Sequence, residues 1–283
     1  MGSIIEISDL QDPRLEDYRD LRDADLRGAR KLFTVESLRV VRRFLRSGWP
    51  ADSILLEPRA ARELAAELET VAPEVPVYLA PEKALRTISG YGFHGGALAL
   101  GRRPVEQPGL DCLDDLLDRP GSTIVAAEGV VHVDNMGSLF RNASCLGADA
   151  VLLSPSCADP LLRKTVRISS GRVFSLPWSF TAPWRESLER LKLDHGFRII
   201  GFDTHSKSVS IDRMHPSERV VLLFGGEGHG LEEATIASCD QLCEIPVRSS
   251  EGRDEDASIN VAVASAIALH ERFRRSRLGD DLD

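Results

Sequence analysis

A short apolar run followed by a glycine-rich loop is the feature that most constrains how this chain folds. Residues 220–224 are all apolar, and the sequence GGEGHG follows at 225–230. A continuous apolar run of this length is typical of a strand buried on both faces of a parallel sheet. Glycine tolerates positive φ and lets a ligand approach the main chain closely. The combination predicts a pocket for a small ligand at the carboxyl end of a buried strand.

The residues after the loop extend this pattern. They predict a helix over 231–237, a turn and a strand over 239–247, and a final Ala-rich helix that Ser258 caps. Asn260 then falls in the first turn of that helix, where Asn is mildly unfavourable, and this placement suggests a role beyond the helix. Glu227, inside the glycine loop, either interacts with the macrodipole of the next helix, or orients an arginine or accepts a hydrogen bond from a ribose hydroxyl.

Residues 118–283 alternate between strand and helix patterns. The predicted strands lie at 123–127, 150–153, 173–176 and 197–202, and the predicted helices lie at 137–146, 159–168 and 184–193. Strands separated by helices predict an α/β domain with a parallel sheet covered on both faces. Residues 1–105 predict a smaller α/β domain, and the proline-containing segment 106–117 predicts the linker between the two domains.

The charge distribution bears on nucleic-acid binding. A formal net charge of −9 argues against a protein that coats nucleic acid nonspecifically, because phosphate binding depends on clustered Lys and Arg. Local basic groups are nevertheless present: the predicted helix 37–47 carries Arg39, Arg42, Arg43 and Arg46 opposite its apolar positions, and the predicted helix 159–168 carries Arg163, Lys164 and Arg167. The first group is either a solvated helix surface or an RNA-facing patch, and both readings stay open.

Other features restrict the class of protein. The five cysteines are an odd number without a CxxC pair, which favours free thiols in a reducing cytoplasm over disulfides or a zinc site. The histidines are scattered and match no metal-ligand spacing, so we expect no metal. No apolar run approaches membrane-spanning length, and no signal-peptide pattern is present, so we expect a cytoplasmic protein without a membrane partner.

A second polar pattern lies at 135–141, where Asn135 and Arg141 fall at the passage from a loop into a helix. A guanidinium fork beside a loop amide is suited to holding a phosphate or ribose group. Taken alone, this heptapeptide is better explained by a capping Asn and a surface Arg.

Three segments together resemble a known family. DNMGSLFRNASCLGADAVLLS, VVLLFGGEGHGL, and IPV with SINVAVASAIALHE are similar, in that order, to the three motifs of the SpoU (TrmH-like) branch of the SPOUT RNA methyltransferases. The resemblance covers about residues 122–272, and the ordered set is specific although each motif alone is weak. FTVES and HGGALAL give the N-terminal unit a looser similarity to the L30e-like RNA substrate-binding domain that precedes the catalytic domain in many members.

The resemblance implies a methyltransferase that uses S-adenosylmethionine to modify a ribose 2′-hydroxyl in rRNA or tRNA. It also implies a homodimer and a deep trefoil knot in the C-terminal domain. By position, the catalytic residues of the motifs match Asn135, Arg141, Glu227, Ser258 and Asn260. The main-chain positions that hold the cofactor match Gly225, Ile245 and Ile259.

The sequence departs from the family pattern in two places. RSSEGRDEDA at 248–257 is longer and more acidic than the usual link before the third motif's Ser, and it bears on the cofactor loop and on the position of Ser258. Ile259 replaces the usual Leu.

Two alternative functions remain. A Rossmann-type nucleotide-dependent enzyme fits the α/β pattern, but the chain lacks the GxGxxG fingerprint. A noncatalytic RNA-binding or ribosome-assembly protein that keeps the fold is disfavoured because the polar residues of all three motifs are present together.

Overall fold

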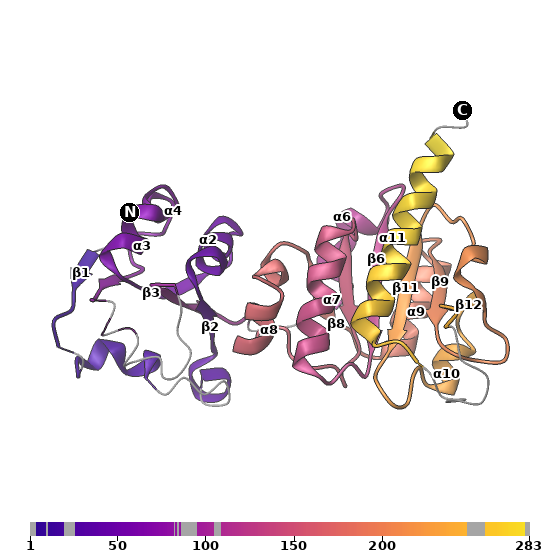
Figure 1. Ribbon diagram of the computed structural model, residues 1–283, viewed down its shortest axis with the longest axis horizontal. Helices are drawn as coiled ribbons and strands as arrows, with labels where there is room; N and C mark the ends of the chain where they lie inside the picture. Colours follow the sequence, from indigo (N-terminus) through magenta and orange to yellow (C-terminus); the bar gives the residue numbers. More distant parts are fainter. Residues whose placement is uncertain are drawn as a thin grey trace. The chain divides into compact units, whose positions relative to one another are not determined.

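The computed structural model describes residues 4–9, 11–19, 26–81, 83, 85, 95–104, 109–247 and 258–280 (Figure 1). The chain forms two compact units. Unit 1 contains residues 1–106 and 159–175, and unit 2 contains residues 107–158 and 176–283. The acidic segment 248–257, noted above as a departure from the family pattern, lies outside the described residues.

This division differs from the expected one in two places. Residues 159–175 were expected in the C-terminal domain, but they pack in unit 1, where the ring of Phe174 stacks on Phe33 at 5.6 Å. Much of the expected linker 106–117 joins unit 2, because Leu113 and Leu117 are buried in its core. An apolar side chain that finds a core keeps its segment from acting as a free linker.

Unit 1 is built on a five-stranded mixed sheet in the order β1-β4-β3-β5-β2. Its strands are β1 (Ile4–Glu6), β2 (Leu32–Glu36), β3 (Ala51–Leu56), β4 (Val77–Leu79) and β5 (Ala97–Arg102). β1, β4 and β3 run parallel, whereas β5 pairs antiparallel with β3 and β2. Its helices are η1 (Pro13–Tyr18), η2 (Leu26–Arg30), α2 (Leu38–Arg46), α3 (Pro58–Glu63), α4 (Ala65–Glu69), α8 (Arg163–Ile168) and η4 (Arg172–Phe174).

Unit 2 contains a seven-stranded sheet in the order β10-β12-β9-β11-β6-β7-β8. Its strands are β6 (Thr123–Glu128), β7 (Ala150–Leu153), β8 (Trp178–Phe180), β9 (Arg198–Phe202), β10 (Val209–Ser210), β11 (Val220–Gly225) and β12 (Gln241–Glu244). Every recorded pairing in this sheet is parallel, so the predicted parallel-sheet domain is confirmed. β11 lies at the centre, which explains why its sequence is continuously apolar.

Helices cover both faces of this sheet. They are η3 (Asp111–Leu113), α6 (Asp114–Leu117), α7 (Val133–Cys145), α9 (Trp184–Leu193), η5 (Ile211–Arg213), α10 (Glu233–Ile236) and α11 (Val261–Asp280). Leucines of α6 and α9 pack with alternate strand residues such as Leu223 on one face. On the other face α7 and α11 lie side by side (Figure 1), joined by a hydrogen bond of 2.6 Å from Asn142 Nδ2 to the Ala262 carbonyl. No helix within the described ranges is both long and apolar enough to span a membrane.

The strand predicted at 173–176 is wrong. Residues 172–174 form the short helix η4 after Gly171, whose φ is +73°, and the strand at this point of the chain is β8, at 178–180. The apolar side chains of Val173 and Phe174 are buried, but they belong to a single helical turn and not to a strand. A short apolar run marks burial without deciding between a strand and another buried conformation.

Candidate functional site

The glycine loop and the first residues of α11 meet at the carboxyl edge of the unit 2 sheet. β11 ends at Gly225, which pairs with Glu128 at the end of β6. Because neighbouring parallel strands end at the same edge, the loops that follow β6, β11 and β12 converge there. This edge is the one that the sequence predicts for a ligand.

The loop at 225–230 folds back on itself and against the chain after β6. A Cβ added at Gly225 would lie 2.2 Å from the carbonyl carbon of Gly230, and one added at Gly226 would lie 2.1 Å from the carbonyl oxygen of Gly129. Gly230 N also donates a 3.1 Å hydrogen bond to the Gly226 carbonyl. Only glycine fits such close backbone approaches, and the fold leaves Glu227 exposed on the loop.

Three polar side chains from three distant segments meet beside this loop. Asn260 Nδ2 donates to Asn135 Oδ1 at 2.9 Å and to Glu227 Oε1 at 2.6 Å. Asn135, on the first turn of α7, is 8% exposed, whereas Glu227 and Asn260 are exposed. The structure therefore joins one residue from each of the three sequence motifs through a single amide group.

The expected helix cap is corrected by the structure. Ser258 was predicted to cap the last helix, with Asn260 inside the first turn. Instead α11 begins at Val261, and Asn260 Oδ1 accepts hydrogen bonds from Ala262 N at 3.0 Å and Val263 N at 3.4 Å. Asn260 is thus the residue that caps the helix. Ser258 is exposed two residues earlier.

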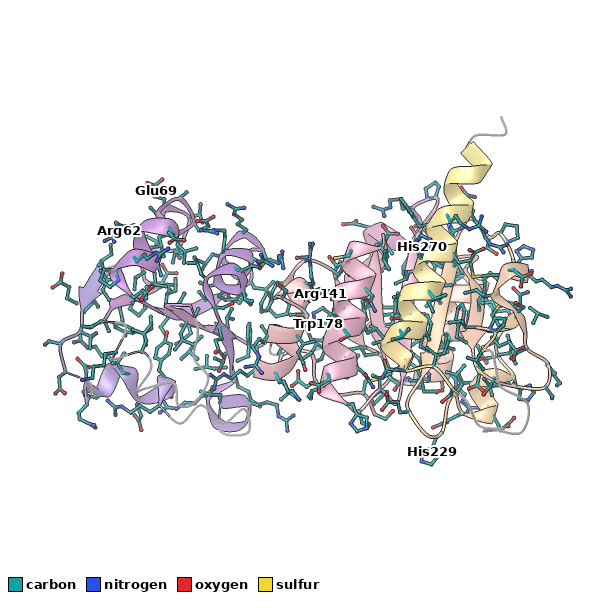
Figure 2. The ribbon with its side chains drawn as sticks, in the orientation of Figure 1. Arg62, Glu69, Arg141, Trp178, His229 and His270 are labelled. Atoms are coloured by element: carbon teal, nitrogen blue, oxygen red, sulfur yellow. The ribbon has the colours of Figure 1, made fainter. Side chains whose placement is uncertain are left out.

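Arg141 lies apart from these three side chains in this chain. It follows Asn135 by six positions on α7, which places its side chain about 240° around the helix axis from that of Asn135. Arg141 is exposed (Figure 2), and the polar contacts recorded for Glu227 come from Asn260 and His132. The structure thus brings together three of the five predicted catalytic residues.

His132 belongs to this group although the sequence analysis did not single it out. Its Nε2 lies 3.6 Å from Glu227 Oε2, and it occupies the position before the first residue of α7. A lone histidine three residues before an Asn carries no recognisable signal in sequence. Only the fold of the glycine loop places the carboxylate beside it.

The three predicted cofactor positions are partly buried and lie around the same edge. Gly225 ends β11, Ile245 directly follows β12, and Ile259 precedes the cap of α11. A separate cavity of about 420 Å³ lies between the ends of β6 and β7 and the start of α9, lined in part by Glu128, Ser154 and Trp184. Neither the polar group nor these three positions line that cavity.

Two of the cysteine thiols have pKa values raised by burial. Burial raises the pKa of Cys239 to about 12 and that of Cys243 to about 11, so both thiols stay protonated at neutral pH. Cys145, Cys157, Cys239 and Cys243 are free. Across the part of the chain that the structure describes, no three His, Cys, Asp or Glu side chains are grouped to hold a metal ion.

Both predicted basic groups belong to unit 1. Arg46 and Arg42 of α2 lie 2.6 and 3.5 Å from the carboxylate of Glu67, which is 6% exposed. Arg163 of α8 pairs at 2.8 Å with Glu36, which is 4% exposed. A buried carboxylate needs such a partner, so these arginines also serve the fold.

The remaining basic side chains are half-buried or exposed on unit 1. Arg43 donates a hydrogen bond to the Ser170 carbonyl and so joins α2 to the segment that follows α8. Arg39, Lys164 and Arg167 are exposed.

Sequence comparison identifies relatives of this chain. The profile of the SpoU rRNA Methylase family matches residues 122–270. An uncharacterized tRNA/rRNA methyltransferase of Mycobacterium bovis is 35% identical over 276 residues, which cover 95% of this chain and 91% of that protein. The 23S rRNA (guanosine-2′-O-)-methyltransferase RlmB of Acinetobacter baylyi is 27% identical over 227 residues, which cover 79% of this chain and 88% of that protein.

Solved structures share the fold of nearly the whole chain. An AdoMet-bound rRNA methyltransferase from Sinorhizobium meliloti matches with a TM-score of 0.80 and 25% identity, over 97% of this chain and 99% of that one. The SpoU methyltransferase AviRb from Streptomyces viridochromogenes matches with a TM-score of 0.76 and 25% identity, over 94% of this chain and 98% of that one. The resemblance drawn from the three motifs is confirmed, and the chain belongs to the SpoU rRNA Methylase family.

Proposed function

We propose that this protein transfers a methyl group from S-adenosylmethionine to a ribose 2′-hydroxyl of rRNA or tRNA. The observation that carries the proposal is the hydrogen-bonded group of Asn135, Glu227 and Asn260 at the carboxyl edge of the sheet. Each of these residues comes from a different motif of the family. The relatives add support, because the Acinetobacter protein is named as a guanosine-2′-O-methyltransferase and the Sinorhizobium protein was solved with AdoMet.

The residues present fit a cofactor that is held by main chain. Close packing of Gly225 and Gly226 against the main chain of Gly230 and Gly129 folds the glycine loop back at the strand end and leaves residues 227–229 exposed there. Gly225, Ile245 and Ile259 would hold the cofactor through their backbones. The cofactor supplies a methyl group already activated on a sulfonium, so the protein's task is to align a hydroxyl with that methyl and to exclude water.

Arg141 is the residue we propose to act on the ribose. Because it lies apart from Asn135 and Glu227 within one chain, the proposal requires assembly of the homodimer to bring Arg141 to the ribose. A guanidinium stays protonated in proteins, so it does not accept a proton as a simple base. A guanidinium can instead bind the neighbouring phosphate and stabilise the negative charge that develops on the 2′-oxygen. Asn135, Glu227 and Asn260 would fix the loop and helix ends against which the ribose is aligned, with Ser258 beside them.

The remaining parts of the proposal concern assembly and RNA contact. We propose that residues 118–283 contain the deep trefoil knot of the family and that the protein is a cytoplasmic homodimer. Light scattering on the purified protein tests the dimer. The N-terminal domain, expected to be L30e-like, would contact RNA through its basic side chains on α2 and α8.

Replacing Arg141 tests the function directly. Purified protein is incubated with labelled S-adenosylmethionine and total RNA from a strain lacking the gene, and any new 2′-O-methyl position is mapped. We expect wild-type protein to label one position, Arg141→Ala to label none, and both to bind S-adenosylhomocysteine equally. Arg190→Ala, which removes an exposed arginine from α9, serves as the control and should label normally.

Two results would contradict the proposal. Turnover by Arg141→Ala equal to that of the wild type would remove Arg141 from the mechanism. Stabilisation by NAD but not by S-adenosylhomocysteine in a thermal-shift assay would favour the nucleotide-dependent alternative.

A further inference from the structure

Two carboxylates hold the far end of the glycine loop from opposite sides. Asp203 directly follows β9, and its Oδ2 accepts a 2.9 Å hydrogen bond from Leu231 N. Glu128 ends β6, and its Oε2 accepts a 3.0 Å hydrogen bond from Glu232 N. Because β9 and β6 are the two neighbours of β11, the acceptors flank the strand from which the loop begins.

The contacts leave little freedom at this end of the loop. A Cβ added at Gly230 would lie 2.4 Å from Asp203 Oδ2, so the carboxylate is packed against the main chain. The second oxygen of Glu128 accepts a 2.7 Å hydrogen bond from Thr235 Oγ1. Glu128 is 5% exposed and Thr235 is fully buried, so losing either partner would leave a buried polar group unsatisfied.

A loop of this composition needs such restraint. Four of its six residues are glycines, which lose more conformational entropy on ordering than other residues do. The β11 ladder fixes the first end through the pairing of Gly225 with Glu128, and the two carboxylates fix the second. Between these ends lies Glu227, the residue that Asn260 binds.

We propose that Glu128 and Asp203 are positioning residues for methyl transfer. Both side chains accept hydrogen bonds from main-chain amides, Asp203 from Leu231 and Glu128 from Glu232, and so set the conformation of residues 225–230. That conformation in turn determines where Glu227 and the main chain of Gly225 lie. The inference rests on the proposed function, since it assigns these two side chains to the site in which the cofactor and the ribose are aligned.

The same sheet provides matched controls at its opposite edge. Asp149 Oδ2 accepts a 2.8 Å hydrogen bond from Thr123 N at the start of β6, and Asp240 Oδ2 accepts one of 2.8 Å from Ile199 N near the start of β9. These carboxylates also accept a hydrogen bond from a main-chain amide, but here the amide belongs to β6 or β9 itself. They do so at the amino edge, away from the loop.

The first experiment measures loop order without using activity. Hydrogen–deuterium exchange of the amides at 226–232 is compared in the full-length wild type, Asp203→Ala, Glu128→Ala, Asp240→Ala and Asp149→Ala. We expect exchange of these amides to accelerate about tenfold or more in the first two variants and to stay at the wild-type rate in the two controls. Equal exchange in all five proteins would overturn the inference.

The second experiment measures cofactor affinity and turnover. We expect Asp203→Ala and Glu128→Ala to weaken S-adenosylhomocysteine binding or lower kcat by about tenfold or more, and the control variants to change either by less than about threefold. Asp203→Asn and Glu128→Gln keep an acceptor oxygen and should recover part of the loss. A loss in the controls as large as in the loop variants would make the role merely structural.

The two experiments separate this inference from the proposed function. If the wild type binds no S-adenosylhomocysteine, the proposed function fails, while the exchange comparison still decides whether the carboxylates order the loop. If Glu128→Ala does not fold, Glu128→Gln and the Asp203 pair carry both tests.

Discussion

At the scale of single residues, Asn260 combines two tasks in one side chain. Its oxygen caps α11, and its nitrogen donates to Asn135 and to Glu227. An amide is the one side-chain group that offers an acceptor and two donor hydrogens at the same point. The start of the last helix is therefore placed by the same residue that closes the polar group.

This double role predicts different effects for two substitutions at Asn260. Asn260→Ala removes the cap, which should cost about 1 kcal/mol of unfolding free energy, and it also removes activity. Asn260→Asp keeps the capping oxygen but sets a second carboxylate against Glu227, so it should retain stability and lose methyl transfer. Urea unfolding and labelled-methyl assays check the pair, and full turnover in Asn260→Asp would show that the Nδ2 donor is dispensable.

At the scale of elements, α11 is fastened to the sheet domain at both ends. Near its carboxyl end Arg275 donates to the Met214 carbonyl at 2.7 Å, and Glu271 is paired with Arg274 and Arg275 on the same helix. The pKa of Glu271 is lowered from 4.5 to about 2, first by a hydrogen bond from Arg274; burial opposes this shift, and a second hydrogen bond from Arg275 adds to it. Glu271 thus holds the side chain of Arg275 in the position from which it binds the Met214 carbonyl.

A pH dependence of stability follows from this pKa. Because the folded-state value lies below the unfolded one, the contribution of Glu271 is complete above pH 4.5 and is lost as the pH falls toward about 2. We expect Glu271→Gln to lose less unfolding free energy than the wild type over that interval, measured by urea unfolding at several pH values. Glu189→Gln, an exposed change on α9, is the control, and parallel pH profiles for Glu271→Gln and the wild type would refute the linkage.

The elements also show what the sequence can and cannot predict. The apolar run of β11 identifies its strand, since a central parallel strand has no exposed face to interrupt it. The mainly apolar segment 173–176 also predicts a strand, but its buried residues Val173 and Phe174 lie in the short helix η4, and an apolar pattern alone does not separate the two cases. Ser258 and Asn260 are both good caps two positions apart, so only the geometry of the helix end decides between them.

The site shows the same limit at longer range. Asn135, Glu227 and Asn260 carry motif signals and were predicted. Glu128 and Asp203 were not, because a carboxylate after an apolar run is also an ordinary strand end. Their role depends on which amides the fold brings to them, and no local pattern contains that information.

At the scale of the whole molecule, the protein is acidic although its proposed substrate is RNA. Its net charge of −9 means that attraction to phosphate has to come from local surfaces. The basic groups of α2 and α8, about 120 positions apart in sequence, both belong to unit 1. Several of their arginines are paired with buried carboxylates, which leaves Arg39 and Arg167 as the clearest exposed candidates.

Charge reversal at these positions tests the RNA surface. Arg39→Glu combined with Arg167→Glu should weaken RNA binding by about tenfold or more at low salt and reduce its salt dependence, because two phosphate contacts would be lost. Arg59→Glu, an exposed change on α3 in the same unit, should have a smaller effect. Filter binding across a salt series measures both, and equal affinities for the double variant and the wild type would exclude this surface.

The interleaving of the two units has a consequence for how the protein is made. The chain leaves unit 2 after β7, supplies residues 159–175 to unit 1, and returns to form β8. When the ribosome has synthesised residues 1–106, Glu36 and Phe33 are present, but their partners Arg163 and Phe174 have not yet been made. Unit 1 can therefore be completed only after β6, α7 and β7 of unit 2 have been synthesised, and a fragment cut at residue 106 would lack the arginine that pairs with Glu36.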